Sequence, residues 1–469
     1  MNLNPKEWAE FIFGQADLGD PRRTTRLTQL TSDMAANAGH SIVKASDSPA
    51  AIEAAYRFIR NDKISAQSIA ESGFKRTSEM IRKLPLVLAI QDTTGLTFKH
   101  SVCEELGEVS CANTLGKPTK TRTLYAHSTL MLDAQTEHIV GLAEQSYWYR
   151  KTKVKGSTEE KQQRPAKEKE SYRWQETSQN IRARTGELSN IIEVCDREAD
   201  TFEYMNHQIV KGQRFLVRAK EKRKLVGPHR NLTELLETTQ GHCCYTVDVK
   251  QRGGRKARQA QVTLSYQSIT FPKPCRAQGL DELKVNVIIC QEKESEQELP
   301  LCWILYTTEP INTAEDAQQL VRYYELRWRV EEFHKVWKSD GTQVEALRLQ
   351  HCENIKRIAV IKAFIAVRLM QLQNVVQNKS EMKEICCTAY VSELTWKLLW
   401  HKVEKGKILP ENTPSLYWLY YAIARLAGWY DSKRNGRVGI KALWQGWLKL
   451  AEIVESSELV ISLLQTEDL

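Results

Sequence analysis

The sequence predicts an α/β protein in which a mixed sheet with covering helices lies between two helical regions. Apolar residues recur at helical spacing before residue 72 and after residue 354, whereas short apolar runs typical of strands occupy the part between. Those runs alternate with helical segments, as in other mixed α/β chains. At 469 residues the chain is also too long for one core, so roughly two to four domains are expected.

The charge balance is compatible with a nucleic-acid partner but does not establish one. The chain has 67 basic and 58 acidic residues, a formal net charge of +9. Bases gather in two clusters, at 218–224 and 250–258, while no basic residue follows Lys449. We therefore expect one part of the chain, and not its C-terminal end, to meet a polyanion.

The cysteines and the apolar runs bear on where the protein works. The eleven cysteines are an odd number without a CxxC pair, which favours reduced thiols over a disulfide framework. The first residues lack the basic and apolar regions of a signal peptide, and no run approaches the ~18 apolar residues of a membrane span. A soluble, cytoplasmic protein is expected.

Residues 1–72 are predicted to form a small helical domain. One helix has Asp20 as its cap, Pro21 at its first position and Gly39 as its stop, and a second begins at Ser48 and Pro49. Both helices carry clustered arginines, which are usually only solvated but also suit DNA recognition. The arginines in question are Arg22, Arg23, Arg26, Arg57 and Arg60.

Residues 73–353 are predicted to hold the sheet. The apolar run "PLVLAI" is followed by Gln91 and ends on Asp92; a hairpin and a helix come next, and "NIIEVC" then ends on Asp196. A β-rich piece at about 221–300 looks inserted, because "LCWILYTTE" resumes the pattern of the core afterwards. The order of three strands, helix, strand, helix, strand, insertion and helix is that of an RNase H-like core, a mixed five-stranded sheet with helices.

The segment "YYELRWRVEEFHKVWK", residues 323–338, is predicted to be one helix after this core. Tyr324, Arg327, Glu331 and Lys338 would fall within roughly 60° of its circumference at about 100° per residue. An acid among bases, beside several aromatic residues, is unusual for a solvated face. Residues 354–469 are predicted to be helical again.

Three acids in this order point to a metal site. A single Asp after a strand is usually a turn or cap residue, but Asp92 and Asp196 end two central strands and Glu331 lies on the helix that follows. Carboxylates brought together repel one another unless a divalent cation lies among them, and oxygen ligands suit Mg²⁺ or Mn²⁺. Two such ions about 4 Å apart can assist both the attacking and the leaving oxygen of a phosphodiester. Tyr324, Arg327 and Lys338 would then hold phosphates beside the metal.

These residues carry a resemblance to a known family. "QDTT" at 91–94, "CDREAD" at 195–200 and the spacing Tyr-x2-Arg-x3-Glu-x6-Lys from residue 324 resemble the bacterial DDE transposases with the YREK signature, the insertion-sequence-four family. The likeness extends from "LGDPRRTTRL" to "ALWQGW" and covers nearly the whole chain. The charged segment 150–173 and the β-rich piece match it least well.

The resemblance implies a role for most of these residues. Asp92, Asp196 and Glu331 would be the catalytic, metal-binding triad, with two Mg²⁺ ions that Mn²⁺ can replace. Trp303 would stack on a flipped base, with help from Trp328, and further groups would grip the terminal phosphates. Those groups are Tyr324, Arg327, Lys338, Arg218 and Lys220.

The resemblance also implies domains, partners and a reaction. Residues 1–72 would recognise transposon ends, 73–353 would be catalytic, and 354–469 would form a homodimer that pairs two ends. The partners would be transposon-end DNA and target DNA, in a bacterial cytoplasm at the nucleoid. Excision through nicking and hairpin formation, then joining to target DNA, is the implied reaction. Two alternatives stay open: an RNase H-like endonuclease that cuts without joining, and an end-binding regulator of transposition.

Overall fold

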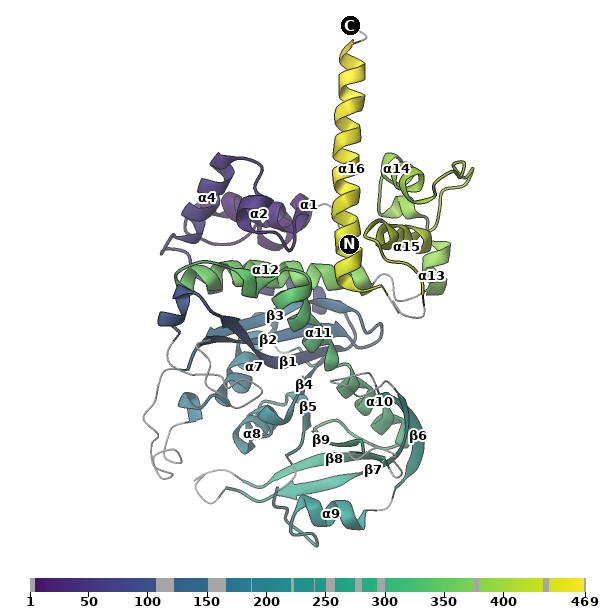
Figure 1. Ribbon diagram of the computed structural model, residues 1–469. Coiled ribbons are helices and arrows are strands. Elements are labelled where there is room, and N and C mark those ends of the chain that lie inside the picture. The colour runs from purple at the N-terminus through teal and green to yellow at the C-terminus, as the bar shows by residue number, and fades with distance from the viewer. Residues whose placement is uncertain are drawn as a thin grey trace.

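A nine-stranded mixed sheet is the centre of the computed structural model (Figure 1). Its strand order is β3-β2-β1-β4-β5-β9-β8-β7-β6, in which β1 pairs parallel with β4 and β4 parallel with β5, while the other neighbours are antiparallel. The structure describes residues 5–106, 122–150, 166–186, 188–220, 223–239, 241–249, 258–274, 281–292, 300–374, 379–432 and 438–467. The predicted α/β class is confirmed.

The strands in the middle of the sheet, β4, β5 and β9, are shorter than those on either side of them. They are β1 (Val87–Phe98), β2 (Arg122–Asp133), β3 (Ile139–Trp148), β4 (Ile191–Cys195), β5 (Arg214–Arg218), β6 (Cys243–Val249), β7 (Arg258–Phe271), β8 (Leu283–Glu292) and β9 (Cys302–Thr307). Because β8 pairs with β9, the β-rich piece expected at about 221–300 extends the central sheet instead of standing apart from it. Among the described residues the sheet therefore has nine strands, where the sequence predicted a five-stranded core with a β-rich insertion.

Helices precede, interrupt and follow the sheet. Before it come α1 (Pro5–Phe13), α2 (Pro21–Ala36), α3 (Ile42–Ala45), α4 (Pro49–Ile59) and α5 (Ala66–Ile81); within it lie α7 (Tyr172–Thr185), α8 (Phe202–Val210) and α9 (Leu232–Thr238). After it follow α10 (Ala314–Glu325), α11 (Trp328–Lys335), α12 (Cys352–Asn374), α13 (Lys379–Glu384), α14 (Glu393–Val403), α15 (Leu416–Leu426) and α16 (Ile440–Glu467). Helix α2 is capped by Asp20 with Pro21 at its first position, as predicted, but it ends at Ala36, before Gly39.

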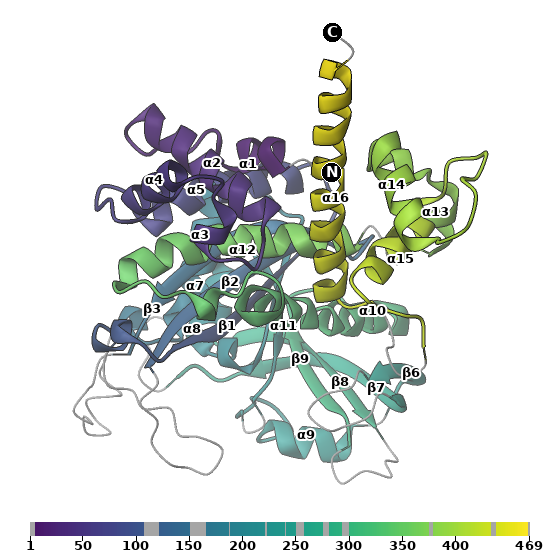
Figure 2. The same cartoon turned by 45° about the horizontal axis from the view of Figure 1, so that its top comes forward.

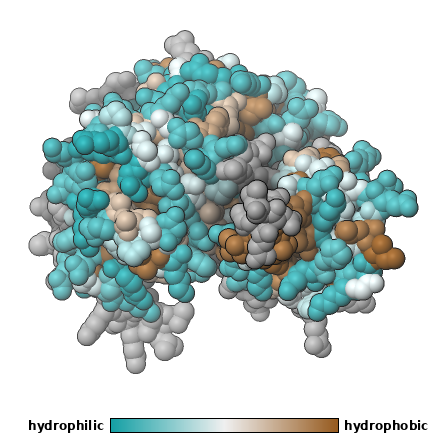
Figure 3. Space-filling model, turned by 90° about the horizontal axis from the view of Figure 1, so that it is seen from above, coloured by the Kyte–Doolittle hydropathy of each residue, from teal (hydrophilic) through white to brown (hydrophobic). Residues whose placement is uncertain are grey.

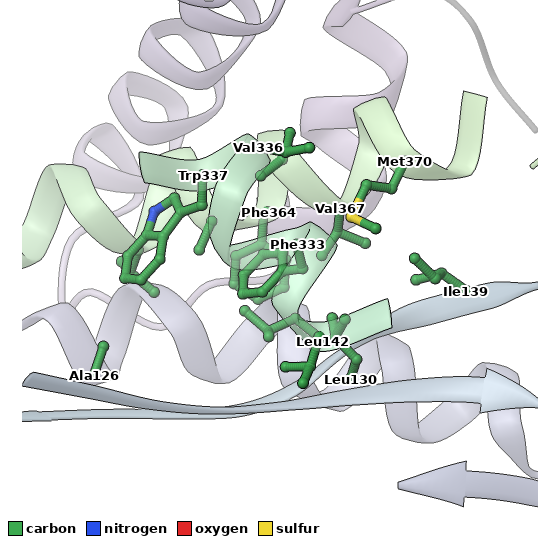
Figure 4. Packing of buried hydrophobic residues seen from close by; sticks show 14 of the residues in the cluster. Ala126, Leu130, Ile139, Leu142, Phe333, Val336, Trp337, Phe364, Val367 and Met370 are labelled. Atoms are coloured by element: carbon green, nitrogen blue, oxygen red, sulfur yellow. The ribbon is translucent and has the colours of Figure 1, made fainter. Parts of the chain in front are cut away.

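The two faces of β1 and β4 are covered by different helices. Because side chains alternate along a strand, Leu88 and Ile90 lie on one face, in the core that also contains α11 and α12. Val87 and Ala89 lie on the other face, against Ile181 of α7. Figure 4 shows the first of these layers, where Phe333, Trp337 and Phe364 lie over the sheet. Even-numbered residues of β1 thus face α11.

Helix α12 joins the N-terminal helices to the sheet. It contacts α2, α4 and α5 on one side and β3 on the other, and lies between them in Figures 1 and 2. The buried Arg357 side chain donates hydrogen bonds to the carbonyl oxygens of Ile59 (2.8 Å) and Ile64, while the Arg368 guanidinium lies over the Trp8 ring. The N-terminal helices and the sheet therefore share one hydrophobic core.

The C-terminal helices form a second, aromatic-rich core. Trp396, Leu399, Leu419 and Tyr420 are buried in it, and Trp429 packs against it. From this region α16 returns to the N-terminal helices, where the Trp444 indole donates a hydrogen bond to the Ala38 carbonyl oxygen at 3.0 Å. The far end of α16 stands clear of the other elements in Figure 1.

Candidate active site

Asp92 lies inside a strand, and this corrects one prediction. Strand β1 continues six residues past Asp92 to Phe98, in unbroken antiparallel register with β2. The two threonines after Asp92 are β-branched and favour a strand, so the apolar run ends at Asp92 but the strand does not. Asp196 does follow its strand directly, and its side chain caps a short 3₁₀ turn by accepting a hydrogen bond from the Glu198 N–H at 2.8 Å.

The segment 323–338 is not one regular helix, and this corrects a second prediction. Helix α10 ends at Glu325, Arg327 stands at the start of α11, and Lys338 lies in a π-helical turn, Val336–Asp340. Between the helices the N–H of Arg327 bonds to the Tyr324 carbonyl oxygen at 3.0 Å, a tighter turn than α-helix. Consequently α10 contacts β7 and β8, whereas α11 contacts β1 and β2.

The three acids nevertheless meet on one face of the sheet. Asp92 occupies an even-numbered position of β1, and Asp196 is the next even-numbered residue after Ile192 and Val194 of β4, on the side that α11 covers with Glu331. Burial, together with the negative charges of Asp196 and Glu331, raises the pKa of Asp92 to about 7 against the opposing effect of Arg327. Two carboxylates can act on the pKa of a third in this way only when they lie near it.

Arg327 is the cation at the centre of this group. Its guanidinium is 3.6 Å from the Asp92 carboxylate and donates a hydrogen bond to Glu331. Burial alone would lower the pKa of Arg327, but Tyr324, Asp92 and Glu331 outweigh burial and raise it. Its side chain is only 13% exposed, so the internal acids compensate its charge in place of water.

The other predicted phosphate contacts fall into two groups around the acids. Tyr324 is buried, lies edge-on to the Trp303 ring with centroids 5.9 Å apart, and shares a hydrogen bond with Arg218. Lys338 lies 3.7 Å from Glu345, which accepts a hydrogen bond from the Thr97 N–H at 2.7 Å. Arg218 and Lys338 are thus each held by another side chain of the protein.

The remaining predicted residues lie further from this centre. Lys220 is exposed beyond β5, and its side chain donates to the Asp200 carbonyl oxygen at 3.2 Å; Trp328 is half-buried as the first residue of α11. The five arginines lie on α2 and at the end of α4, separated from the sheet by α12. The basic residues predicted at 250–257, and 151–165 of the charged segment, lie outside the described residues.

Two residues in the site were missed by the sequence reasoning. His334 is buried with its Nδ1 3.8 Å from the Asp92 carboxylate, and burial, then the charge of Lys338, lowers its pKa to about 3, so it is neutral. It follows Glu331 by three residues, a helical spacing that could have identified it. Glu345, which holds Lys338, lies in a 3₁₀ turn two residues after Gln343, whose backbone is in the left-handed region. No short sequence pattern identifies Glu345 as part of the site.

The donor set has the chemistry of a magnesium site, but the arrangement is not closed around an ion. Three carboxylates on one face supply the oxygen ligands that hard divalent cations prefer. Within the described part of the chain, however, no three acidic, histidine or cysteine side chains are close enough together to hold a metal ion. Arg327 contacts both Asp92 and Glu331, so a guanidinium takes up part of the space between these two carboxylates.

Comparison with family models agrees with this architecture. Residues 5–64 match the model for Transposase DNA-binding, and residues 149–368 match the model for a Transposase DDE domain, whose acids give it its name. Together the two matches support a DNA transposase of the DDE type, a DNA-binding enzyme of the kind that generally depends on metal. The DDE match contains Asp196, Glu331 and Lys338, while Asp92 precedes it. No helix among the described residues is long and apolar enough to cross a membrane.

Proposed function

We propose that the chain is a YREK-signature transposase of the insertion-sequence-four family, similar to the transposase of Tn-five, with Asp92, Asp196 and Glu331 as its catalytic triad. The observation that carries this proposal is the electrostatic coupling of the Asp92 carboxylate to those of Asp196 and Glu331, with Arg327 beside Asp92 and Glu331. The order β3-β2-β1-β4-β5 and the helices between these strands support an RNase H-like core within the larger sheet.

The reaction that fits the site is phosphodiester cleavage and transfer. Two Mg²⁺ ions, replaceable by Mn²⁺, would be held by the triad and would stabilise the attacking and leaving oxygens. Water first cuts one strand at the element end, releasing a 3′-hydroxyl. That hydroxyl attacks the opposite strand, which closes a hairpin on the element and releases the flanking DNA; water then reopens the hairpin, and the 3′ end joins target DNA. No step needs a covalent protein–DNA bond.

The bases of the site would position the DNA backbone. Arg327 can hold a phosphate through two N–H groups at once, and Lys338 can hold one as a point charge. Each has an internal acid as its partner in this structure, Glu331 for Arg327 and Glu345 for Lys338. A DNA phosphate that attracts Arg327 would therefore also release Glu331 for the metal. Arg218 and Lys220 would extend this grip along the same strand.

Trp303 would receive an unstacked base. It lies on β9, is only partly buried, and meets the Tyr324 ring in an edge-to-face contact beside Arg218. Stacking a flipped base on an indole can return ~1–3 kcal/mol of the few kcal/mol that unstacking costs. Trp328, two residues before the buried Val330, would support the same end of the duplex.

The N-terminal helices would read the transposon end. Arg22, Arg57 and Arg60 are exposed, and Arg22 is 91% exposed although it pairs with Asp20. Arg23 and Arg26 are half-buried on the same helix as Arg22, and Arg23 donates to the Leu18 carbonyl oxygen at 2.7 Å. Exposed arginines on two neighbouring helices suit contacts with phosphates and with base edges in a groove.

The projecting end of α16 would pair two copies of the chain. Figure 3 shows hydrophobic side chains gathered around this end, and those of Leu459, Val460, Ile461, Leu463 and Leu464 are between 40% and 64% exposed. An apolar helix end of this kind favours burial against a partner. Leu463→Glu should therefore reduce complexes that hold two transposon ends while leaving single-end binding unchanged, as a mobility-shift assay would measure.

The test of the proposed function uses the DNA repeats that flank the gene. Both repeats are placed on a supercoiled plasmid and mixed with protein, Mg²⁺ and a target plasmid. We expect an excised fragment with transient hairpin ends, followed by insertion, and none of these products with Glu331→Ala. Glu332→Ala is the matched control, because Glu332 is the next residue on α11 but pairs with Arg329 at 2.8 Å.

The same experiment separates the alternatives. Breaks without joining would favour the endonuclease, and binding without cleavage by either protein would favour the regulator. Cleavage by Glu331→Ala at a rate near that of the parent would show that the triad is wrongly assigned.

A further inference from the structure

The backbone pairing between the two strands that carry Asp92 and Asp196 ends just before these residues. Strands β1 and β4 pair in parallel over only four residues each, from Val87 with Ile191 to Ile90 with Val194. Asp92 is two residues beyond the last pair on β1, and Asp196 is two residues beyond it on β4. The spacing of the two carboxylates is therefore not fixed by main-chain hydrogen bonds between their own strands.

A buried side-chain hydrogen bond ties the strands together at this point. The Gln91 amide donates to the Glu193 carboxylate at 2.7 Å, and both side chains are at most 5% exposed. Gln91 immediately precedes Asp92, and Glu193 is three residues before Asp196. Because side chains alternate along a strand, this bond lies on the face opposite the acids, against α7 and α8.

Both ends of this bond are held by further groups. The same Glu193 oxygen accepts hydrogen bonds from the Ser178 hydroxyl of α7, at 2.5 Å, and from the Tyr204 hydroxyl of α8, at 2.7 Å. At the other end of the bond, the oxygen of the Gln91 side-chain amide lies 3.2 Å from His127 Nε2. His127 Nδ1 in turn lies 2.9 Å from the Thr93 hydroxyl. Two helices and strands β1, β2 and β4 thus meet in one buried polar network.

Such a network is costly to bury and needs every member in place. Apolar side chains of similar size would fill the same space without that requirement, so the network gives geometry more than stability. It joins the two strands where the main-chain ladder stops and where two acids stand on the opposite face.

We propose that the Gln91–Glu193 bond, with Ser178, Tyr204 and His127, is a positioning network that sets the separation of the Asp92 and Asp196 carboxylates. The proposal rests on the function proposed above, in which these two acids bind a divalent cation. Neither Gln91 nor Glu193 touches the reacting atoms; they act through the backbone of β1 and β4.

The test measures metal binding directly. Mn²⁺ is titrated into the full-length protein bound to transposon-end DNA, and free Mn²⁺ is followed by electron paramagnetic resonance. Changes in groups that orient metal ligands typically weaken metal binding about 10–100-fold. We expect Glu193→Gln to weaken Mn²⁺ binding at least tenfold while end binding without metal is unchanged.

A matched control separates positioning from general loss of stability. Glu144→Gln removes an equally buried carboxylate on the same face, which pairs with Arg184 of α7 at 2.8 Å but belongs to β3. It should lower the melting temperature yet leave Mn²⁺ binding within about twofold of the parent. The exchange Gln91→Glu with Glu193→Gln restores an amide–carboxylate pair and should recover part of the lost Mn²⁺ affinity.

Asp92→Asn is the reference for the metal itself. If Asp92→Asn weakens Mn²⁺ binding but Glu193→Gln does not, the positioning role is wrong and the proposed function stands. If Asp92→Asn leaves Mn²⁺ binding unchanged, Asp92 is not a ligand and both proposals fail. Should Glu193→Gln not fold, Tyr204→Phe removes one donor and leaves the Gln91–Glu193 bond in place. It should weaken Mn²⁺ binding severalfold, and parent-like binding would overturn the positioning role.

Discussion

Asp92 and Glu404 are both carboxylates beside an arginine, yet their surroundings act on them in opposite directions. At Glu404 burial raises the pKa, but hydrogen bonds from Lys407, Arg425 and Trp418 outweigh it and lower the pKa to about 2. At Asp92 burial outweighs Arg327, and two further acids add to it, so the pKa rises to about 7. The ion pairs of Glu404 stabilise the C-terminal region, whereas Arg327 does not offset the burial and the neighbouring acids that raise the pKa of Asp92, a perturbation typical of functional sites.

The largest effect expected from this contrast is on cleavage. Asp196→Asn should lower the rate of end cleavage on the order of a thousandfold, because transition-state stabilisation worth several kcal/mol is lost. Gel analysis of end cleavage by the folded protein measures it. Asp200→Asn is the control: Asp200 is buried and bonded to Arg223 and to the Lys220 N–H, so its loss should lower stability more than the cleavage rate. Equal losses of cleavage rate in both variants would contradict a catalytic role for Asp196 that Asp200 does not share.

The next effect is a stability change with the opposite sign to that of an ordinary ion pair. The folded Asp92 carboxyl keeps its proton to about pH 7, while the unfolded one loses it near 3.8, so stability falls as the pH rises between these values. The difference in free energy of unfolding between Asp92→Asn and the parent should therefore be roughly 2–4 kcal/mol more favourable to the variant at pH 8 than at pH 4. Urea unfolding in chelator measures this, with Asp281→Asn, a change to an exposed acid, as the control. A gain independent of pH would contradict the assignment.

Glu404→Gln should behave in the reverse way. Its lowered pKa means that the stabilising ion pairs are complete above about pH 4.5 and are lost as the pH falls towards 2. We expect the free energy of unfolding to fall by about 1–2 kcal/mol at pH 7 and by less in acid, as urea unfolding would measure. End cleavage should be unaffected. A loss of metal binding in this variant would show that the two regions are not independent.

The smallest effect concerns the internal partner of Lys338. Glu345→Gln removes the charge that holds Lys338 but keeps an oxygen for the Thr97 N–H. A partly exposed ion pair is worth about 1 kcal/mol or less, so end DNA should bind up to about fivefold more tightly at low salt. Fluorescence anisotropy with labelled end DNA measures the affinity, and Lys338→Gln should cancel the gain. Weaker binding by Glu345→Gln would mean that Glu345 helps to hold the DNA.

The sequence singles out the three acids but not the elements that carry them. Asp92 and Asp196 each end an apolar run, and Glu331 is an acid among bases on a predicted helix; their role as a triad stays a prediction. The continuation of β1 past Asp92 depends on twelve residue pairs with β2, which no local pattern contains. Likewise the break before Arg327 arises because α10 packs on β7 and β8 while α11 packs on β1 and β2, a requirement set by the assembled sheet.

The buried network behind the acids was also beyond prediction from the sequence. Gln91 and Glu193 are 102 residues apart, and each alone is a polar residue beside apolar ones, with no local sign of its partner. Only the pairing of β1 with β4 brings them together and excludes water. Polar partners of this kind become visible once the strand register is known.

The position of α12 has a consequence for the order in which the chain can fold. The helices of residues 5–64 are synthesised before α12, yet their core is completed by Arg357 and Arg368, which follow some 300 residues later. Until α12 leaves the ribosome, the apolar sides of α2 and α4 have no α12 to pack against. A fragment that ends before residue 352 should therefore need a chaperone or aggregate, and the DNA-binding helices become a finished surface only when the catalytic part is nearly complete.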